Sequence, residues 1–200
     1  ADAMAASVKA GKKWQVVGFG TIMGETDAPA QAMDWLGPNA PERSRNYVRA
    51  GVTAGKLGLP MNFDNWGGYP AARARFLKSA QDMGAELVVI SGDSHNGWAY
   101  DLANGGERAG VEFAGHSVTS PGFEASTAAD PKVIAAGMIA ANPELKWCDT
   151  SNRGYMMMTI EADRVTNQYL FCDTVREHEK NMRIGKTLSV ARGEKLLSAV

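Results

Sequence analysis

The apolar positions of the chain form two short runs that predict buried strands. Trp14–Phe19 is rich in aromatic and β-branched residues and is bounded by glycines, which is typical of a short strand between turns. Glu86–Ser91 contains a continuous apolar stretch, and such a stretch indicates a strand that is covered on both faces of its sheet. A helical segment, a glycine, a buried strand and a polar turn follow one another here, which favours a layered α/β architecture.

The segment before the second run predicts a helix. Pro70 suits the first helical position, and Gly84 suits the position just past the end. Apolar residues recur at spacings of four, four and three and form one stripe: Ala72, Phe76, Ala80 and Met83. The same spacing predicts that the charged residues of this helix are mostly available to solvent: Arg73, Arg75, Lys78 and Asp82.

Shorter patterns predict the remaining elements. We expect helices at Ala1–Lys13, Ala28–Leu36, Glu42–Ala50 and Asp130–Ala141. We expect strands at Trp98–Leu102, Val111–Val118, Tyr155–Glu161 and Val165–Cys172, with a turn at Asn104–Gly106 joining the first two. The charged segment Glu177–Val200 has weak patterning, and it predicts a peripheral helix or a loosely attached tail.

Composition narrows the class of protein. A hydrophobic fraction of 44% with 22% charged residues is that of a globular protein, and no apolar run has the length of a membrane span. A formal net charge of -1 argues against binding of polyanions such as nucleic acid through bulk charge. Cys148 and Cys172 are too few for a disulfide framework, so we expect buried free thiols, with a single bridge as the alternative.

The turn Gly92-Asp93-Ser94-His95 follows the second buried run and is the strongest candidate for chemistry. Ligands bind outside the carboxyl ends of strands in open α/β sheets, and this turn occupies such a position. A carboxylate and an imidazole two residues apart suit iron, manganese or zinc, and the carboxylate alone also suits calcium. The alternative is an ordinary polar turn, in which Asp93 caps a helix and His95 bonds a neighbouring strand. Two ligands are also fewer than a catalytic metal usually holds.

Three stretches, in order along the chain, resemble signatures of the PhoD-like (alkaline phosphatase D) family of metallophosphoesterases. Gly92–Ala99 resembles the family's Gly-Asp-Val-His-x-x-Trp-Ala motif. Asn62–Arg73 is similar to its Asn-x-Asp-x-Trp-Asp-Gly-Tyr-Pro-Ala-x-Arg stretch, and Val111–Gly122 to its Glu-Phe-Val-Gly-Thr-Ser-Ile-Thr-Ser-Pro-Gly strand and turn. Arg153–Tyr155 fits as well, so the resemblance extends over most of the chain.

The resemblance implies the C-terminal half of a calcineurin-like β-sandwich flanked by helices, with residues 1–175 in that domain and 176–200 as its tail. It implies catalytic and metal-binding roles for Asp93 and His95, with iron and calcium as the metals and manganese or zinc as alternatives. Substrates are then small-molecule phosphate esters, attacked by metal-activated water. The other ligands are expected from an N-terminal portion of the same enzyme, so this portion alone is expected to be inactive. Family members are exported, which implies a periplasmic or secreted location.

Several further residues admit two interpretations. Asp64 and Trp66 are candidates for binding substrate, and an Asx-turn role for Asp64 is equally favoured. His116 is expected in the core or at a sheet edge. Arg43, Arg45 and Arg49 suit either phosphate binding or a solvated helix surface. A non-catalytic module that binds a partner through residues 21–65 is the alternative to an enzyme.

Overall fold

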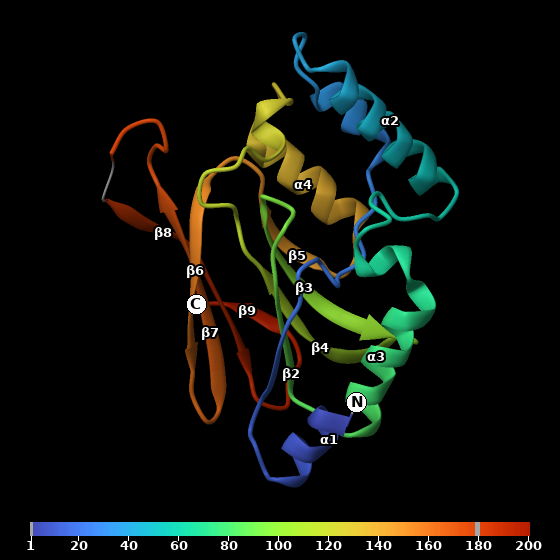
Figure 1. Ribbon diagram of the computed structural model, residues 1–200, viewed down its shortest axis with the longest axis vertical. Helices are drawn as coiled ribbons and strands as arrows, with labels where there is room; N and C mark the ends of the chain where they lie inside the picture. The colour runs from blue at the N-terminus through green and yellow to red at the C-terminus, as the bar shows by residue number, and fades with distance from the viewer. Residues whose placement is uncertain (1, 179–180) are drawn as a thin grey trace.

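The computed structural model describes residues 2–178 and 181–200, and two β-sheets stacked face to face form its centre (Figure 1). The first sheet has five strands in the order β1-β2-β4-β3-β5, and the second has four in the order β6-β7-β8-β9. The strands of the first sheet are β1 (Gln15–Gly18), β2 (Leu87–Ser91), β3 (Gly97–Asn104), β4 (Glu107–Ala114) and β5 (Leu145–Asp149). Those of the second are β6 (Arg153–Ile160), β7 (Arg164–Cys172), β8 (Met182–Ala191) and β9 (Leu197–Ala199).

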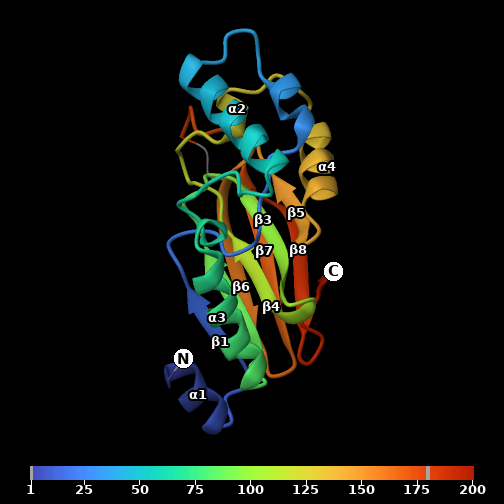
Figure 2. The same ribbon diagram turned by 90° about the vertical axis from the view of Figure 1, so that its right-hand side faces the viewer.

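Helices cover the outer face of the first sheet, as the side view shows (Figure 2). The α-helices are α1 (Asp2–Lys9), α2 (Glu42–Lys56), α3 (Pro70–Asp82) and α4 (Pro131–Ala141). Short 3-10 turns occur at η1 (Ala30–Trp35), η2 (Trp66–Gly68) and η3 (Phe123–Ala125). None of the helices in the described residues combines the length and the apolar character needed to cross a membrane.

Strand β2 shows why the sandwich forms. It pairs in parallel with β1 on one side and with β4 on the other. Leu87 and Val89 belong to the core beneath the helices, whereas Val88 belongs to the core between the sheets. Side chains alternate between the faces of a strand, so a continuous apolar run serves two cores at once. The α/β sandwich predicted from the pattern and the resemblance is confirmed.

Local signals set the limits of several elements as predicted. Helix α3 begins at Pro70, and Gly84 follows its end with a positive φ of 62° that glycine adopts without strain. The β3–β4 hairpin turns at Gly105 and Gly106, both of which have positive φ. Two such residues are what the favoured two-residue hairpin turns require.

The prediction of a helix or loose tail after residue 176 was wrong. Residues 182–191 form β8 along the whole length of β7, and β9 pairs with β8. Leu188 and Val190 point into the core between the sheets, but the charged side chains around them mask this short alternation in the sequence. Residues 179 and 180 of the predicted segment lie outside the described residues.

The expectation that Arg73 faces solvent was also wrong. Its side chain is 6% exposed, and its guanidinium contacts the Glu144 carboxylate at 2.6 Å and the Met23 carbonyl at 2.8 Å. It lies next to the apolar stripe of α3, where a long side chain can cross the helix surface and bind buried acceptors. Strand β5 was not predicted at all, because it is short and two of its five residues are charged.

Both cysteines are free thiols, as expected, with Cys148 buried and Cys172 half-buried. Burial raises the pKa of Cys148 to about 12, which leaves it in the unreactive thiol form.

Candidate metal centre

The turn between β2 and β3 has an unusual backbone. Asp93 has a φ of 67° and His95 a φ of 62°, and only three described residues other than glycine have positive φ. This left-handed conformation costs free energy in residues that carry a Cβ, and strain of this kind clusters at functional sites. Asp and His adopt this conformation more readily than most residues with a Cβ, but two of them within one turn still hold the potential ligands at some cost in free energy.

The Asp93 side chain is exposed at the surface of this turn. Within residues 2–178 and 181–200 its carboxylate makes no hydrogen bond and no ion pair. Helix capping, the ordinary alternative for this residue, is thereby excluded in the described structure. The carboxylate is left available to a ligand from outside these residues.

Among the described residues, the His95 ring is held by a hydrogen bond through one nitrogen. Its Nδ1 lies 2.9 Å from the carbonyl oxygen of Pro121. Because a carbonyl can only accept a hydrogen bond, Nδ1 must carry the proton, and Nε2 of the neutral ring is then an unprotonated acceptor. A backbone carbonyl on one ring nitrogen is the arrangement that orients metal-binding histidines.

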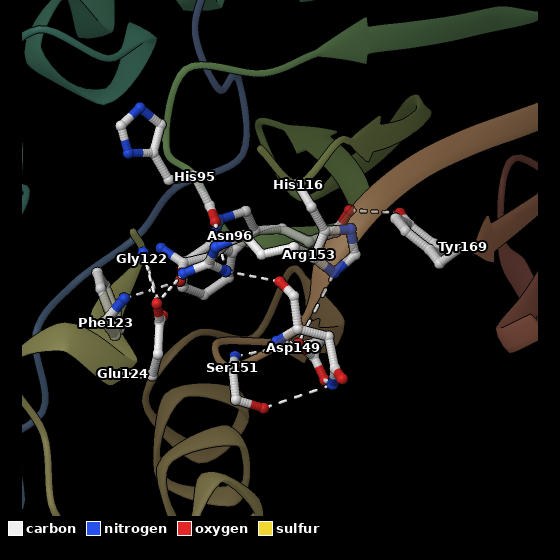
Figure 3. A network of polar contacts seen from close by, with 12 residues as sticks. His95, Asn96, His116, Gly122, Phe123, Glu124, Asp149, Ser151, Arg153 and Tyr169 are labelled. Carbon is white, nitrogen blue, oxygen red and sulfur yellow. Dashed lines mark hydrogen bonds and ion pairs between the residues drawn. The ribbon is translucent and has the colours of Figure 1, made fainter. Parts of the chain in front are cut away.

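A cluster of polar contacts around Asn96, Arg153 and Glu124 holds the backbone of the turn (Figure 3). Asn96 is fully buried, its amide donates to the Ser94 carbonyl, and its Oδ1 accepts from the N–H of Phe123. The guanidinium of Arg153 pairs with the Glu124 carboxylate and also reaches the His95 carbonyl oxygen at 3.5 Å. Figure 3 shows the His95 ring pointing away from this cluster, so the cluster acts on the backbone of the turn and not on the ring.

The donor set fits part of a metal site. A carboxylate oxygen and an imidazole nitrogen are ligands of iron, manganese and zinc, and the oxygen also suits calcium. No group of three or more His, Cys, Asp or Glu side chains within the described residues could hold a metal ion. Asp93 and His95 can therefore supply two ligands, and the described chain supplies no complete set.

A cavity of about 340 Å³ adjoins the turn. Its wall includes Ser94, between the two candidate ligands, and Pro121, whose carbonyl binds His95. Helices α2 and α4 contribute to its other walls and lie together at the upper end of the molecule in both views (Figures 1 and 2). The volume lies within the range of small-molecule sites.

The two residues expected to bind substrate make local contacts of other kinds. Trp66 packs against Phe19 with ring centroids 4.9 Å apart and against Phe76 at 5.7 Å. Asp64 is exposed, and its N–H bonds the side chain of Asn62 in an Asx turn. No hydrogen bond, ion pair or ring contact in the described part of the chain links either residue to Asp93 or His95.

His116 belongs to the core between the sheets, as expected. Its side chain is 0% exposed, packs edge-on against Phe171, and has Nε2 3.8 Å from a carboxylate oxygen of Asp149. Burial would raise the pKa of Asp149, but the contact with His116 and the backbone N–H donors of the following turn outweigh it and lower the pKa to about 2. His116 thus packs against a charged carboxylate in the interior, and no hydrogen bond or ion pair within the described residues joins it to Asp93 or His95.

The three arginines of α2 divide between the two interpretations. Arg45 donates to the carbonyl oxygens of Gly37 and Pro38 and so fixes a loop. Arg49 bonds Asn46 on the exposed face of the helix. Only Arg43 lines the cavity beside the turn.

A second polar network lies behind the turn and is fully buried. Glu112 of β4 accepts hydrogen bonds from the Ser91 hydroxyl at 2.5 Å and from the N–H groups of Met23 and Gly24 at 2.8 and 2.7 Å. Burial raises the pKa of Glu112 to about 6 despite these donors. The network attaches the segment after β1 to the sheet, so that part of residues 21–65 is not a free binding loop.

Sequence reasoning missed the residues that support the turn. Asn96 and Arg153 fall within stretches that matched family signatures, yet nothing local indicates what they bind. Arg153 meets Glu124 across 29 positions, and His95 meets Pro121 across 26. Only the proline-glycine pair at 121 and 122, which predicts a turn, gave a signal near these partners.

Comparison with known proteins agrees with this architecture. The sequence profile of PhoD-like phosphatases matches residues 1–169. Alkaline phosphatase D of Bacillus subtilis (strain 168) is 33% identical over 122 residues, which cover 58% of this chain and 20% of that protein. A solved structure described as that of PhoD superposes with a TM-score of 0.70 at 20% identity, covering 100% of this chain and 34% of the other. The chain thus spans about a third or less of these relatives, and it belongs to the PhoD-like phosphatase family.

Proposed function

We propose that this chain supplies a carboxylate and an imidazole to the metal centre of a phosphate-ester hydrolase. Membership of a phosphatase family supports the reaction class. Two observations point to these residues: the Asp93 carboxylate has no partner in the described residues, and the His95 ring is bound to Pro121 through Nδ1. The Asp93 oxygens and His95 Nε2, two positions apart in one turn, are therefore left as potential donors.

Each residue of the turn has a separate task in this proposal. Asp93 offers a hard oxygen ligand, and His95 offers Nε2 in the neutral tautomer that its Pro121 contact selects. Asn96 and Arg153 hold the backbone, so the two donors keep their relative position. Iron with calcium, or else manganese or zinc, would supply a Lewis acid and a water of lowered pKa when bound there.

The remaining ligands come, in this proposal, from residues beyond those of this chain. The chain spans 20% of alkaline phosphatase D, and its two donors are fewer than the three or more of catalytic metal sites. We therefore expect it to bind one ion weakly and not to turn over bis(para-nitrophenyl) phosphate. Robust turnover by the pure chain with more than one metal bound would contradict this.

Calorimetric titration with Mn²⁺ and Zn²⁺ tests the site. Asp93→Ala and His95→Ala should each weaken binding at least about tenfold, because each removes one of two ligands. Asp34→Ala and His178→Ala, which change exposed residues of the same types, should leave the affinity unchanged. Equal affinities in all four variants and the unmodified chain would exclude a metal site at this turn.

A further inference from the structure

The cavity beside the turn has a mainly apolar wall. Trp35, Leu36, Val48, Met61, Phe123 and Met138 contribute to it. Within the described residues its lining includes no carboxylate and no lysine, and Arg43 is its one permanently charged group. Such a surface favours an apolar ligand with few polar attachment points.

Most of the hydroxyl groups that line the cavity are already engaged with the protein, and Tyr47 is the one lining residue in the described chain whose hydroxyl makes no hydrogen bond. Ser126 donates to the Ser44 hydroxyl at 2.8 Å, and Thr127 donates to the Phe123 carbonyl at 3.0 Å. Ser94 accepts from the Trp98 indole at 2.7 Å. A sugar or polyol would bring many hydroxyls into a cavity that offers them few polar groups, chiefly those of Tyr47 and Arg43, so most of its desolvation would go uncompensated.

The cavity and the candidate metal turn share a wall. Ser94 separates Asp93 from His95 in the sequence, and Pro121 both lines the cavity and binds the His95 ring. A phosphate group held by a metal at Asp93 and His95 would therefore place one ester substituent next to the cavity mouth. The rest of the substrate would lie outside the cavity.

We propose that this cavity is the binding subsite for a compact apolar alcohol group of the phosphate ester, an aryl ring system or a short alkyl chain. The proposal rests on the proposed function, because that function places the phosphate at the turn. The volume of about 340 Å³ is at the small end of ligand sites, which excludes a long lipid chain lying wholly inside.

Nuclear magnetic resonance with 2-naphthol as the probe tests the subsite without phosphate or metal. Saturable binding is expected, with nuclear Overhauser contacts from naphthol protons to the methyl groups of Val48, Met61 and Met138. Glycerol at the same concentrations should give no contacts to these methyl groups. Absence of naphthol contacts, contacts confined to another surface, or equal binding of glycerol would each overturn the proposal.

Val48→Phe should fill the cavity and weaken naphthol binding at least about tenfold, because the space for the ring is lost. Val133→Phe is the matched control, since Val133 is 55% exposed on α4 and does not line the cavity. An unchanged affinity in a folded Val48→Phe chain would count against the subsite. If that variant does not fold, the methyl contacts in the unmodified chain still decide.

These experiments distinguish failure of the metal site from failure of the apolar subsite. Asp93→Ala should abolish the metal response and leave naphthol binding unchanged, because the probe carries no phosphate. If naphthol binds, but Asp93→Ala and His95→Ala leave the metal affinity unchanged, the subsite is supported and the metal site is excluded. If both substitutions weaken metal binding but naphthol does not bind, the metal site is supported and the subsite is overturned.

Discussion

Asp93 and Glu112 are carboxylates near the carboxyl end of β2, and the protein uses them in opposite ways. Glu112 is 0% exposed and accepts hydrogen bonds from Ser91, Met23 and Gly24. Asp93 is exposed, strained in its backbone and without a partner in the described residues. A saturated carboxylate holds the fold together, whereas an unsaturated one on a fixed backbone is available for binding.

The largest effect is expected at the buried guanidinium of Arg73, which pairs with Glu144 and also binds the carbonyl oxygen of Met23 beside the Glu112 network. Arg73→Ala should lower the free energy of unfolding by about 3–5 kcal/mol, because it leaves the Glu144 carboxylate without its buried partner. Arg75→Ala, on the exposed face of the same helix, should change it by less than about 0.5 kcal/mol. Chemical denaturation of both variants measures the difference, and equal stabilities would show that the network contributes little.

Gly122→Ala tests how the turn is supported, because Gly122 lies against Asn96 and His95. A Cβ there would lie 2.4 Å from Asn96 Oδ1 and 3.0 Å from the His95 carbonyl oxygen. We expect a loss of about 1–3 kcal/mol in stability, together with weaker metal binding. Gly92→Ala, where a Cβ meets no atom within 4 Å, is the control for stability. If the two variants unfold at the same denaturant concentration, the turn is not held as described.

Glu112 should make the folded state less stable as the pH rises. Burial raises its pKa from the ordinary 4.5 to about 6, so the folded state binds the proton more tightly than the unfolded state. The resulting stabilisation is complete below the unfolded pKa and is lost as the pH rises through about 6. Between about pH 4 and about pH 7 the unmodified chain should lose about 2 kcal/mol relative to Glu112→Gln. A constant difference across this range would contradict a raised pKa.

The smallest effect is expected at Asp93 itself. Asp93→Gly should raise the free energy of unfolding by about 0.5–1 kcal/mol, because glycine adopts the φ of 67° without a Cβ penalty. The same change should remove metal binding, because it deletes a proposed ligand. A gain in stability at the cost of binding is common at functional sites. Thermal unfolding of Asp93→Gly beside Asp93→Ala measures the gain, and a variant less stable than the alanine one would argue against strain at this turn.

The sequence predicted the parts of this account that depend on short-range signals. Pro70, Gly84 and the apolar run of β2 have local physical reasons for their positions, and the structure follows them. Arg73 was missed because a charged side chain was assumed to be solvated, and its partner Glu144 lies 71 positions away. Strand β8 was missed because the charged residues around its apolar positions mask the alternation. The support of His95 by Pro121 could not be predicted, since it depends on how two distant loops pack.

Imidazole nitrogen chemical shifts during a zinc titration show whether His95 and Asp93 bind metal together. We expect the Nε2 resonance of His95 to shift on adding Zn²⁺, while its Nδ1 stays protonated against Pro121. Asp93→Ala should greatly weaken this response. His116, enclosed between the sheets, and His178 should not respond at low zinc concentration. An unchanged His95 spectrum, or a response that survives Asp93→Ala in full, would contradict the assignment of this turn as a metal site.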